Sequence, residues 1–300
     1  MSLLKNNFKE KLGAIILCAG EGKRLKKITK SLPKPLIKID KLNKIPIINH
    51  ILNNLIDLEI NHIAVVIGYL GDTIRKAISS LKKSNNFSQI NVVVIDAKNQ
   101  YKLGPLYSFL SITKNKSFFS SNYYYIVIPG DTVFDKDILK EILDLLSKNY
   151  NLIHDSPFIF YRNIKLKVLK QIYKKSRLVS IAELIKVDSN VVLKRISQVK
   201  IKDIISSDEI NQIIPIFTFN YNFIQEILAL SDHIHLKTIW ETFNYMIDNS
   251  RKIYAFKINS NKQFYDIDSK DDLKNLKKKE RTIGAPINQS VIDSKGLKKV

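Results

Sequence analysis

The stretch "AIILCAGEGKRLKKITKSLPKPL", residues 14–36, decides the fold. It begins with an unbroken apolar run at 14–19 and passes directly into a loop that contains two glycines, Lys23 and Arg24. Apolar runs without alternation are typical of strands covered on both faces, as in parallel sheets. Glycines placed after such a strand allow backbone N–H groups to approach an anion closely. The stretch therefore predicts an α/β protein with an anion-binding loop at the end of its first strand.

The remainder of the first half repeats this alternation. Apolar runs and amphipathic segments follow one another, which predicts strands at 62–69, 90–96 and 123–129 and helices at 46–58, 72–83, 104–114 and 136–148. Strands that alternate with helices of this length form β-α-β units around a parallel sheet, with helix layers on both faces. Pro46 suits a first helical turn, and Asp72 is expected to cap the helix that follows it. Ligands of such sheets bind beyond the carboxyl ends of the strands, where the opening loop lies.

The second half differs in character. Short β-rich runs predict mixed or antiparallel strands over 157–219, among them KVLKQIY at 167–173. The elements expected after them are two helices near 222–230 and 236–248, a strand at 252–258 and a last helix that Ser269 and Asp272 would cap. Together these elements fit one domain over residues 1–279, in two halves that meet near residue 150. A polar tail at 280–300 follows.

Composition narrows the classes of function. The chain carries 49 Lys and Arg against 28 Asp and Glu, a net charge of +21, which draws attention to nucleic acids. The lysines are scattered, however, and no ribonucleoprotein signature or zinc spacing accompanies them. We therefore expect nucleic acid not to be the main partner, and keep a basic nucleic-acid-binding protein as an alternative. A cationic surface also attracts small anions such as nucleotides.

The single cysteine, Cys18, lies inside the first apolar run and excludes an internal disulfide or a multi-cysteine metal site. We expect it to be a buried structural thiol. No run of 18 apolar residues and no apolar signal segment is present, so we expect no membrane span and a cytoplasmic protein. The sequence does not decide the oligomeric state, and a homo-oligomer stays open.

The loop itself contains a second feature, Lys34 between Pro33 and Pro35. Two prolines fix the backbone on both sides of the lysine, so its ammonium group is held in place as a point charge. Neither a GxxxxGK[ST] P-loop nor the third glycine of the dinucleotide fingerprint is present. The loop is therefore an anion-binding site of another kind, with Lys23, Arg24 and Lys34 as its charges.

These residues resemble the signature of the sugar-phosphate nucleotidyltransferases, L-x-A-G-x-G-x-R-L, T, P-K-P-L and P-I in that order. The matching positions are 17–25, Thr29, 33–36 and 45–47, and the family's later Leu-Gly and Gly-Asp pairs have counterparts at 103–104 and 130–131. The resemblance implies a Rossmann-like three-layer nucleotidyltransferase fold with a mixed, mainly parallel central sheet. It also implies that the first half binds the nucleotide and the second half the acceptor.

The reaction implied by the resemblance transfers a nucleoside monophosphate from a nucleoside triphosphate to a sugar 1-phosphate or a similar phosphorylated alcohol, with release of pyrophosphate and dependence on Mg²⁺. Arg24 and Lys34 match the catalytic positions. The nucleotide-binding positions are Leu17, Ala19, Gly20, Glu21, Gly22, Lys23, Asn99 and Gly104. Lys200 falls near the acceptor-binding position, with Lys202 as a close rival.

Three aspartates are expected to serve the metal. Asp131 follows an apolar strand, where a carboxylate can hold Mg²⁺ against substrate phosphates, although an ordinary turn aspartate has the same context. The segment around Tyr265 resembles the family's second metal-binding segment, and Asp266 falls on its carboxylate position. Asp268 is an alternative ligand, or a residue that precedes a helix cap.

Several departures leave the acceptor open. Pro215 stands where the family usually carries a glycine that contacts the sugar, and Pro105 follows Gly104 where a small or hydroxyl residue is common. The Asp-x-Asp-Ser ending also resembles cytidylyltransferases that act on inositol 1-phosphate or phosphocholine, and the Asp-x-Asp pair fits a metal-dependent glycosyltransferase. A non-catalytic nucleotide-sugar-binding protein is the alternative outside the enzymes. His233 and His235 could share a metal, but a loop before a helix explains them better.

Overall fold

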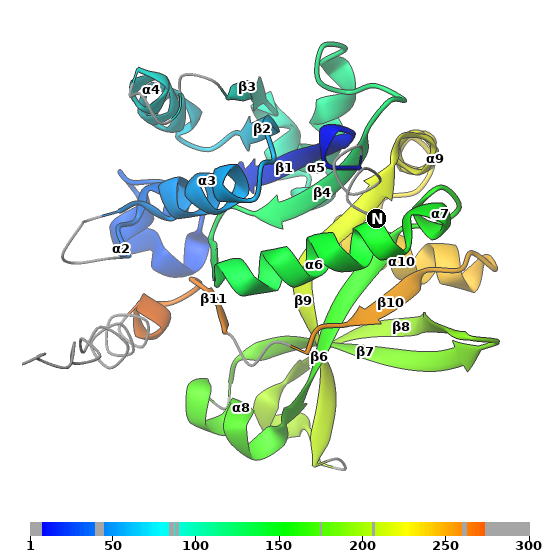
Figure 1. Cartoon of the computed structure of the whole chain (residues 1–300). Helices are drawn as coiled ribbons and strands as arrows, with labels where there is room; N and C mark the ends of the chain where they lie inside the picture. The colour runs from blue at the N-terminus through cyan, green and yellow to red at the C-terminus, as the bar shows by residue number, and fades with distance from the viewer. Residues whose placement is uncertain are drawn as a thin grey trace, which may run out of the picture.

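One sheet of nine strands runs through the part of the chain that the computed structural model describes, which is residues 8–39, 45–83, 87, 90–174, 176–205, 208–259 and 263–273 (Figure 1). Its strands are β1 (Leu12–Cys18), β2 (His62–Ile67), β3 (Asn91–Asp96), β4 (Tyr124–Pro129), β6 (Phe158–Lys165), β7 (Leu178–Val187), β8 (Asn190–Lys200), β9 (Glu209–Asn220) and β10 (Tyr254–Lys257). They lie in the order β3-β2-β1-β4-β9-β6-β10-β8-β7. A separate two-stranded sheet pairs β5 (Thr132–Phe134) with β11 (Phe264–Asp266). The tail expected at 280–300 lies outside the described residues.

Most strands of the large sheet point the same way. β1 pairs in parallel with β2 and β4, and β2 with β3. β9 runs antiparallel between β4 and β6, β10 is parallel to β6, and β8 opposes both β10 and β7. β8 and β9 are thus the two strands of this sheet that run against the others. The expectation of a mixed, mainly parallel central sheet is confirmed.

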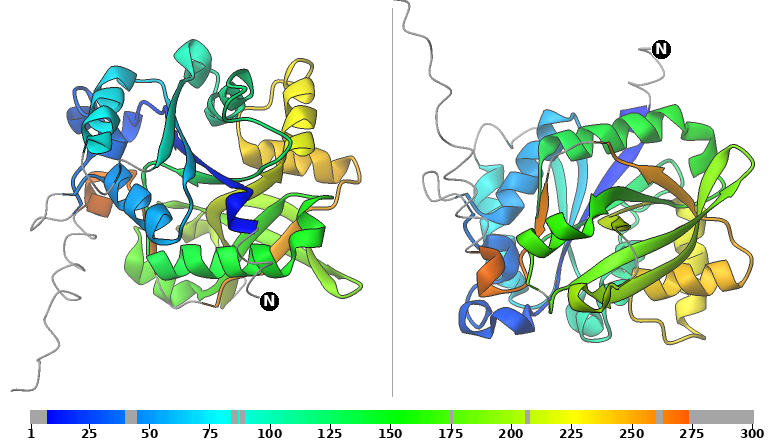
Figure 2. Two further views of the ribbon diagram at one scale, coloured as in Figure 1. Left: turned by 45° about the horizontal axis from the view of Figure 1, so that its top comes forward. Right: turned by 90° about the horizontal axis from the view of Figure 1, so that it is seen from below.

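Helices cover both faces of this sheet, which gives three layers (Figure 2). Ile16 of β1 belongs to a core that also contains Ile48 and Ile142, whereas the adjacent Ile15 belongs to a second core with Phe109 and Phe243. Neighbouring residues on a strand point to opposite faces, so the two cores lie on opposite sides of the sheet. The first core is covered by α3 (Ile47–Asp57), α4 (Gly71–Lys82), α6 (Lys136–Lys148) and α7 (Tyr150–Ile153), and the second by α5 (Pro105–Leu110), α9 (Tyr221–Ser231) and α10 (Ile239–Asp248).

Helix starts in the first half differ in detail from the expectation. Pro46 is the N-cap residue of α3 and directly precedes its first turn. The capping role expected for Asp72 is wrong, because α4 begins one residue earlier and its N-cap position is Leu70, with φ of 52°. Asp72 lies instead in the first turn, where a negative charge interacts favourably with the helix dipole. The helix expected at 104–114 is divided into α5 and a 3-10 turn, Ser111–Lys114.

The strand expected at 167–173 is a helix, α8 (Leu166–Ile172). Leu166, Leu169 and Tyr173 are spaced at i, i+3 and i+7, and all three pack in a small third core. This is the period of one helix face, which the lysines between these residues obscure in the sequence. The other β-rich runs of this region form β6, β7, β8 and β9, as expected.

Pro215 lies within β9, in the middle of the sheet, where a proline usually removes a ladder hydrogen bond. Ile159 of β6 pairs with Phe217 and the next residue, Phe160, pairs with Ile214, so Pro215 and Ile216 are two extra residues in β9. An irregular bulge of this kind leaves residues outside the ladder, and the missing N–H of the proline therefore costs no strand pairing.

Two capping boxes organise the second half. In α10, Thr238 and Glu241 exchange hydrogen bonds between side chain and backbone. Near the end of the described chain, Ser269 Oγ accepts a hydrogen bond from the N–H of Asp272, and the Asp272 carboxylate accepts one from the N–H of Ser269. The box expected at Ser269 and Asp272 is therefore confirmed. None of the helices in the described ranges has the length and apolar character that a membrane crossing needs.

Candidate functional site

The carboxyl ends of β1, β2 and β4 meet at one edge of the sheet. The N–H of Tyr69 donates to the carbonyl of Ala19 at 3.0 Å, and the N–H of Gly130 donates to the carbonyl of Leu17 at 2.9 Å. A Cβ atom at Gly130 would lie 2.4 Å from Cys18 Sγ, so only glycine allows the chain after β4 to pass this close to β1. This contact sets Asp131, the next residue, beside the loop that follows β1.

The loop is folded onto the side chain of Lys34. Gly22 has a φ of +63°, a conformation that L side chains rarely adopt, and its carbonyl accepts a hydrogen bond from Thr29 Oγ1 at 3.0 Å. A Cβ atom at Gly22 would lie 3.0 Å from Lys34 Cγ and 2.9 Å from Thr29 Cγ2. Pro33 and Pro35 flank Lys34 in a short 3-10 turn, as the sequence implied. The backbone of the loop and the lysine stem therefore hold each other in place.

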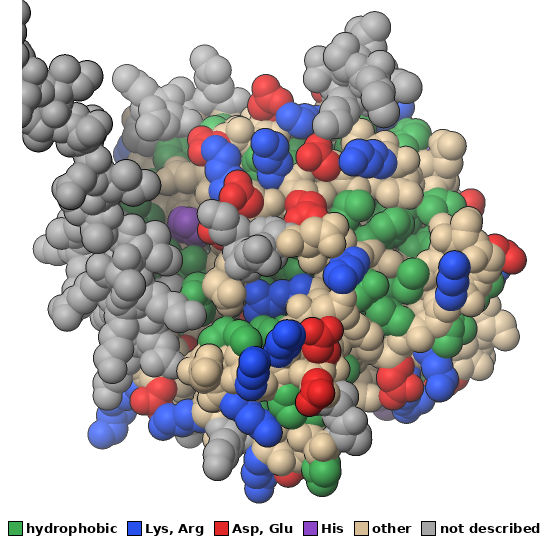
Figure 3. Space-filling model, turned by 60° about the horizontal axis from the view of Figure 1, so that its bottom comes forward, with side chains coloured by type: hydrophobic (Ala, Val, Ile, Leu, Met, Phe, Trp, Pro, Cys, Tyr) green, Lys and Arg blue, Asp and Glu red, His purple; other side chains and the backbone are tan. Residues whose placement is uncertain are grey.

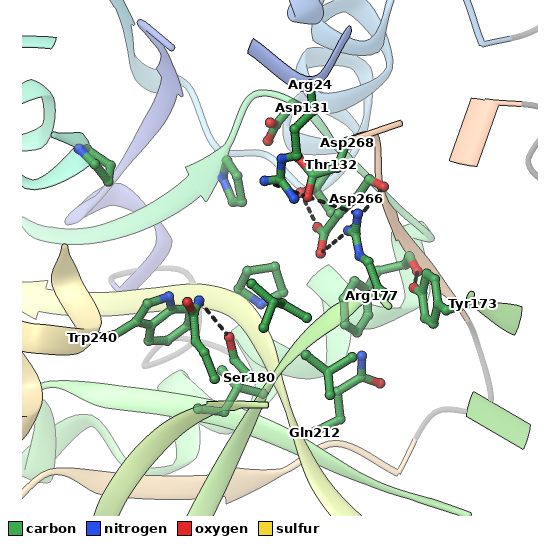
Figure 4. Close-up of a pocket in the computed structure, with 18 residues that line it drawn as sticks. Arg24, Asp131, Thr132, Tyr173, Arg177, Ser180, Gln212, Trp240, Asp266 and Asp268 are labelled. Atoms are coloured by element: carbon green, nitrogen blue, oxygen red, sulfur yellow. Dashed lines mark hydrogen bonds and ion pairs between the residues drawn. The ribbon is translucent and has the colours of Figure 1, made fainter. Parts of the chain in front are cut away.

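Asp268 is the centre of an ionic cluster with Arg24 and Arg177 (Figure 4), to which Lys34 also belongs. The Lys34 ammonium lies 2.8 Å from Asp131 Oδ2 and 2.9 Å from Asp268 Oδ1. The other oxygen of Asp268 lies 3.0 Å from Arg24 Nη2 and 2.9 Å from Arg177 Nη1. One carboxylate thus contacts three cations, of which Arg24 and Lys34 follow β1 and Arg177 precedes β7. Charge-assisted contacts of this length are the stronger kind of hydrogen bond.

Asp266 is positioned by the pairing of β11 with β5, in which it lies opposite Thr132. Thr132 Oγ1 donates a hydrogen bond of 2.6 Å to Asp266 Oδ1, and Arg177 Nη2 lies 3.5 Å from Asp266 Oδ2. The N–H of Ile267 donates to the carbonyl of Asp131 at 3.0 Å. The small sheet therefore brings two aspartates that are 135 positions apart, 131 and 266, to one place.

The pKa values of Asp266 and Asp268 are shifted in opposite directions by their surroundings. The pKa of Asp266 is raised to about 6, mainly by burial and in addition by the charges of Asp131 and Asp268, while the hydrogen bond from Thr132 and the charge of Arg177 oppose the rise. About 35% of its side-chain surface stays exposed. Burial also tends to raise the pKa of Asp268, but Lys34 and Arg177 outweigh it and hold that pKa below its ordinary value. Asp268 therefore carries a negative charge at neutral pH and is the ionised partner of the cations.

Burial lowers the pKa of Lys34, but the charges of Asp131 and Asp268 outweigh this effect and keep the pKa above its ordinary value. For Arg177, too, burial is opposed by carboxylates, here Asp268, Asp266 and Asp272, and its pKa is raised. Both cations therefore carry a full charge at neutral pH.

A cavity of about 380 Å³ opens beside this cluster. Four of the residues expected from the sequence line it, namely Arg24, Asp131, Asp266 and Asp268. Lys34 contacts two of these four. Figure 3 shows a face of the molecule on which Lys and Arg side chains gather beside a central hollow. Four of the five positions expected to be catalytic or metal-binding thus surround a common space.

The remaining expected residues are distributed less evenly. Gly20, Glu21, Gly22 and Lys23 lie on the loop after β1, with Lys23 exposed and 3.5 Å from Glu21. Asn99 is exposed in a 3-10 turn (Lys98–Lys102), and Gly104 precedes Pro105, which lines the cavity.

Lys200 is not among the residues that line the cavity. It is exposed at the end of β8, opposite Leu178. Its rival Lys202 is exposed in the turn after β8. His233 and His235 lie in the loop before α10, and the described residues hold no group of three or more His, Cys, Asp and Glu placed to bind a metal.

Sequence reasoning missed Arg177, Thr132 and Trp240, all of which line the cavity. Arg177 precedes β7 and is one of 49 basic residues, so nothing in the sequence distinguishes it. Its guanidinium contacts three carboxylates, those of Asp266, Asp268 and Asp272. Only the tertiary structure identifies it.

The carboxylates suit a hard divalent cation unequally. Asp131 and Asp266 line one cavity and leave 34% and 35% of their side chains exposed, which leaves room for the water ligands that Mg²⁺ retains. Asp268 has both oxygens in contact with protein cations and only 16% of its side chain exposed. The residues present therefore fit Mg²⁺ on Asp131 and Asp266 better than on Asp268.

Parts of the chain are similar in sequence to known proteins. The family model "Nucleotidyl transferase" matches residues 13–160. A 2-aminoethylphosphonate cytidylyltransferase of Lancefieldella rimae is 41% identical over 70 residues, which is 23% of this chain and 27% of that protein. The bifunctional protein GlmU of Methanococcus maripaludis is 33% identical over 133 residues, 44% of this chain and 28% of that protein. The matches thus span about a quarter of the length of these curated relatives.

Solved structures extend the likeness of fold over nearly the whole chain. A crystal structure of UDP-glucose pyrophosphorylase complexed with UDP-glucose superposes with a TM-score of 0.64 at 16% identity, and the match covers 90% of this chain and 98% of that one. Such identity shows the fold alone. The match of the family model places residues 13–160, which include most of β1, the loop after it and β4, in the nucleotidyl transferase family.

Proposed function

We propose that this protein transfers a nucleoside monophosphate from a nucleoside triphosphate to the phosphate of a small acceptor and releases pyrophosphate. The observation that carries the proposal is the convergence of Arg24, Asp131 and Asp266 on one cavity at the carboxyl edge of the sheet, with the Lys34 ammonium 2.8 Å from Asp131. A binding module without chemistry has no need for two carboxylates beside a lysine fixed by prolines. The convergence also speaks against the non-catalytic alternative.

The reaction needs no covalent intermediate with the protein. An oxygen of the acceptor phosphate attacks the α-phosphorus, the bond from that phosphorus to the bridging oxygen breaks, and pyrophosphate departs with the electron pair. A phosphate oxygen is already anionic, so no base has to remove a proton. The obstacle is the repulsion between two polyanions, and catalysis consists mainly of positioning and neutralising charge.

Each group of the site has a role in this scheme. The N–H groups of the loop at 20–22 and the guanidinium of Arg24 bind the β and γ phosphates. Lys34 lies between the α-phosphate and the acceptor phosphate. Leu17, Ala19, Asn99 and Gly104 surround the base, with the Asn99 amide free to suit more than one base edge. The acceptor enters from the side of β7, β8 and β9.

Asp131 and Asp266 would hold Mg²⁺. When bound, this ion neutralises charge on the phosphates that it contacts. The charge count explains the need for it. Arg24, Lys34 and Arg177 carry three positive charges, and the four carboxylates at positions 131, 266, 268 and 272 carry four negative ones when ionised, so the cluster alone does not neutralise a polyanion.

Cytidylyl transfer to a non-sugar acceptor is the second candidate. It is supported by the name of the relative with 41% identity, a 2-aminoethylphosphonate cytidylyltransferase. The Asp-x-Asp-Ser sequence at 266–269 agrees with it, as does the presence of Pro215 in the cavity wall in place of a sugar-contacting glycine.

Pyrophosphate release is the test of the proposal. The purified chain would be incubated with Mg²⁺, each of CTP, UTP, GTP and dTTP, and a panel of sugar 1-phosphates and non-sugar phosphomonoesters. We expect release with one preferred pair and loss of release in Arg24→Ala. Full turnover of Arg24→Ala, or no release with any pair, contradicts the proposal. Binding to nucleic acid alone, with affinity that falls steeply with salt, would favour the nucleic-acid alternative.

A further inference from the structure

The cavity has two chemically different ends (Figure 4). The ionic end contains the charged residues described above. The other end is formed by β7, β8, β9 and α10, and none of the described side chains that line it carries a charge. Its walls are mainly Leu178, Val179, Ile213, Pro215 and Trp240. The organic part of an acceptor whose phosphate occupies the ionic end must therefore fit a largely apolar wall.

Polar groups at the neutral end are few and partly engaged. Gln198 Nε2 donates to Ser180 Oγ at 3.4 Å. Gln212 Oε1 accepts two hydrogen bonds from the Arg162 guanidinium, at 3.0 and 2.9 Å. The ring of a hexose 1-phosphate carries four free hydroxyl groups that each need a partner, and every hydroxyl buried without one lowers affinity by about fivefold to a hundredfold. This wall satisfies a hydroxyl-rich ring poorly.

Pro215 strengthens this preference. It lies in the irregular bulge of β9 and lines the cavity, where its ring presents carbon atoms and its nitrogen has no hydrogen to donate. A glycine at such a place would offer a free N–H and space for a hydroxyl. The wall therefore excludes one more contact that a sugar could use.

Trp240 provides the recognition element. Its ring packs at 81° against Phe217, with 4.6 Å between the ring centres, and it sits in the first turn of α10 behind the Thr238 capping box. In the described chain, the Lys and Arg side chains found over aromatic rings lie over Tyr101, Tyr173 and Phe264. The indole is the aromatic ring that attracts cations best, and here it is fixed in advance.

We propose that the acceptor is a phosphomonoester of a short alkylammonium alcohol, with its phosphate at the ionic end and its cationic head on the Trp240 ring. This inference rests on the proposed function and narrows its acceptor. A fully methylated head group has no N–H to donate, which suits the apolar wall best, and its charge is of the sign that the indole face attracts. The transfer itself is unchanged, since the phosphate oxygen attacks the α-phosphorus and pyrophosphate leaves.

A substrate panel tests the class of acceptor. Phosphocholine and phosphoethanolamine would be compared with glucose 1-phosphate, N-acetylglucosamine 1-phosphate and inositol 1-phosphate, each with all four triphosphates. We expect kcat/KM to be at least tenfold higher for an alkylammonium ester than for any hydroxyl-rich acceptor. If a sugar or inositol phosphate is preferred, the inference is wrong and the proposed function stands. If no pair releases pyrophosphate, both fail.

Trp240 variants test the recognition element. The neutral carbon isostere of phosphocholine, 3,3-dimethylbutyl phosphate, has the same shape without the charge, and we expect wild type to favour phosphocholine by about threefold to thirtyfold. Trp240→Leu should make the activities with phosphocholine and its neutral isostere equal. Trp240→Phe should retain part of the preference for phosphocholine and keep the packing on Phe217. Tyr245→Leu, on the same helix and not among the lining residues, is the matched control and should keep the full ratio. An equal preference in wild type, or an unchanged ratio in Trp240→Leu, overturns the proposal.

Discussion

A single ammonium group, that of Lys34, contacts carboxylates from two distant parts of the chain, and its side chain is 10% exposed. Replacement by methionine keeps the stem that packs on Gly22 but removes the charge. We expect Lys34→Met to lower kcat/KM by a factor that corresponds to about 2 to 4 kcal/mol of activation free energy. This is the usual effect of deleting one preorganised electrostatic contact. Steady-state pyrophosphate release is the measurement. Lys30→Met, at an exposed position four residues earlier, is the matched control. Equal activity of the two variants would show that Lys34 has no role in the reaction.

The raised pKa of Asp266 predicts how the free energy of unfolding changes with pH. Its pKa is about 6 in the folded protein and about 3.9 in an unfolded chain, so between these values the folded state binds more protons. The free energy of unfolding contributed by this group is therefore fully present below pH 4 and is lost as the pH rises through 6. We expect the stability of Asp266→Asn relative to wild type to increase from pH 4.5 to pH 7.5. Urea unfolding without divalent ions measures it, and a difference independent of pH would contradict the assignment.

Asp268→Asn is the control of opposite sign. The pKa of Asp268 is lowered in the folded protein, so its contribution is present above the unfolded value and is lost as the pH falls through the folded one. We expect this substitution to cost more stability at pH 5 than at pH 3. The two aspartates, two residues apart, should thus give pH profiles of opposite slope.

The turn before α5 depends on Gly104. Its φ of +136° and ψ of 171° are available almost only to glycine, and a Cβ atom there would lie 2.5 Å from the carbonyl oxygen of Lys237. We expect Gly104→Ala to lower the free energy of unfolding by about 1 to 3 kcal/mol, because the turn must separate from the loop before α10. Gly20→Ala is the control, since a Cβ atom at Gly20 meets nothing within 4 Å. Equal urea midpoints for both variants would contradict this reading of the turn.

Elements could be predicted from the sequence where one physical signal dominates. Continuous apolar runs identified β1, β2, β3 and β4, because buried parallel strands tolerate few polar residues. The run at 167–173 was misassigned because its short helix buries only one face in a small core. Asp72 fits a cap by composition, but the cap position depends on a left-handed Leu70 that no pattern reveals.

The site was predictable where its residues lie in one local motif. Arg24, Lys34 and the glycines of the loop follow one another along the chain, and the two flanking prolines distinguish Lys34 from the many other lysines of the sequence. Arg177 could not be found, because its function depends on carboxylates about 90 positions away, which only β11 brings near. Lys200, at the exposed end of β8, is not among the residues that line the cavity, and its contact with the acceptor stays a prediction.

The net charge of +21 has a consequence for the protein as a whole. A strongly cationic molecule attracts a triphosphate over distances that salt shortens, from about 10 Å at 0.1 M to about 3 Å at 1 M ionic strength. We expect kcat/KM for the triphosphate to fall as KCl is raised at fixed Mg²⁺, while kcat at saturating substrate changes much less. Initial rates at several KCl concentrations measure both constants. A kcat/KM that is insensitive to salt would show that capture is not electrostatic.

The close passage of Gly130 over Cys18 has a practical consequence. The only sulfhydryl of the sequence is walled in by backbone and 2% exposed, and burial, with the nearby charge of Asp131, raises the pKa of the Cys18 thiol. Alkylating reagents attack the thiolate and need access to it, so they should leave the native fold unlabelled. A cysteine introduced at the exposed Ser79 of α4 would then be the residue that a thiol-reactive fluorophore labels, and Cys18 would not have to be replaced. The folded protein should therefore give no background labelling in single-molecule fluorescence measurements.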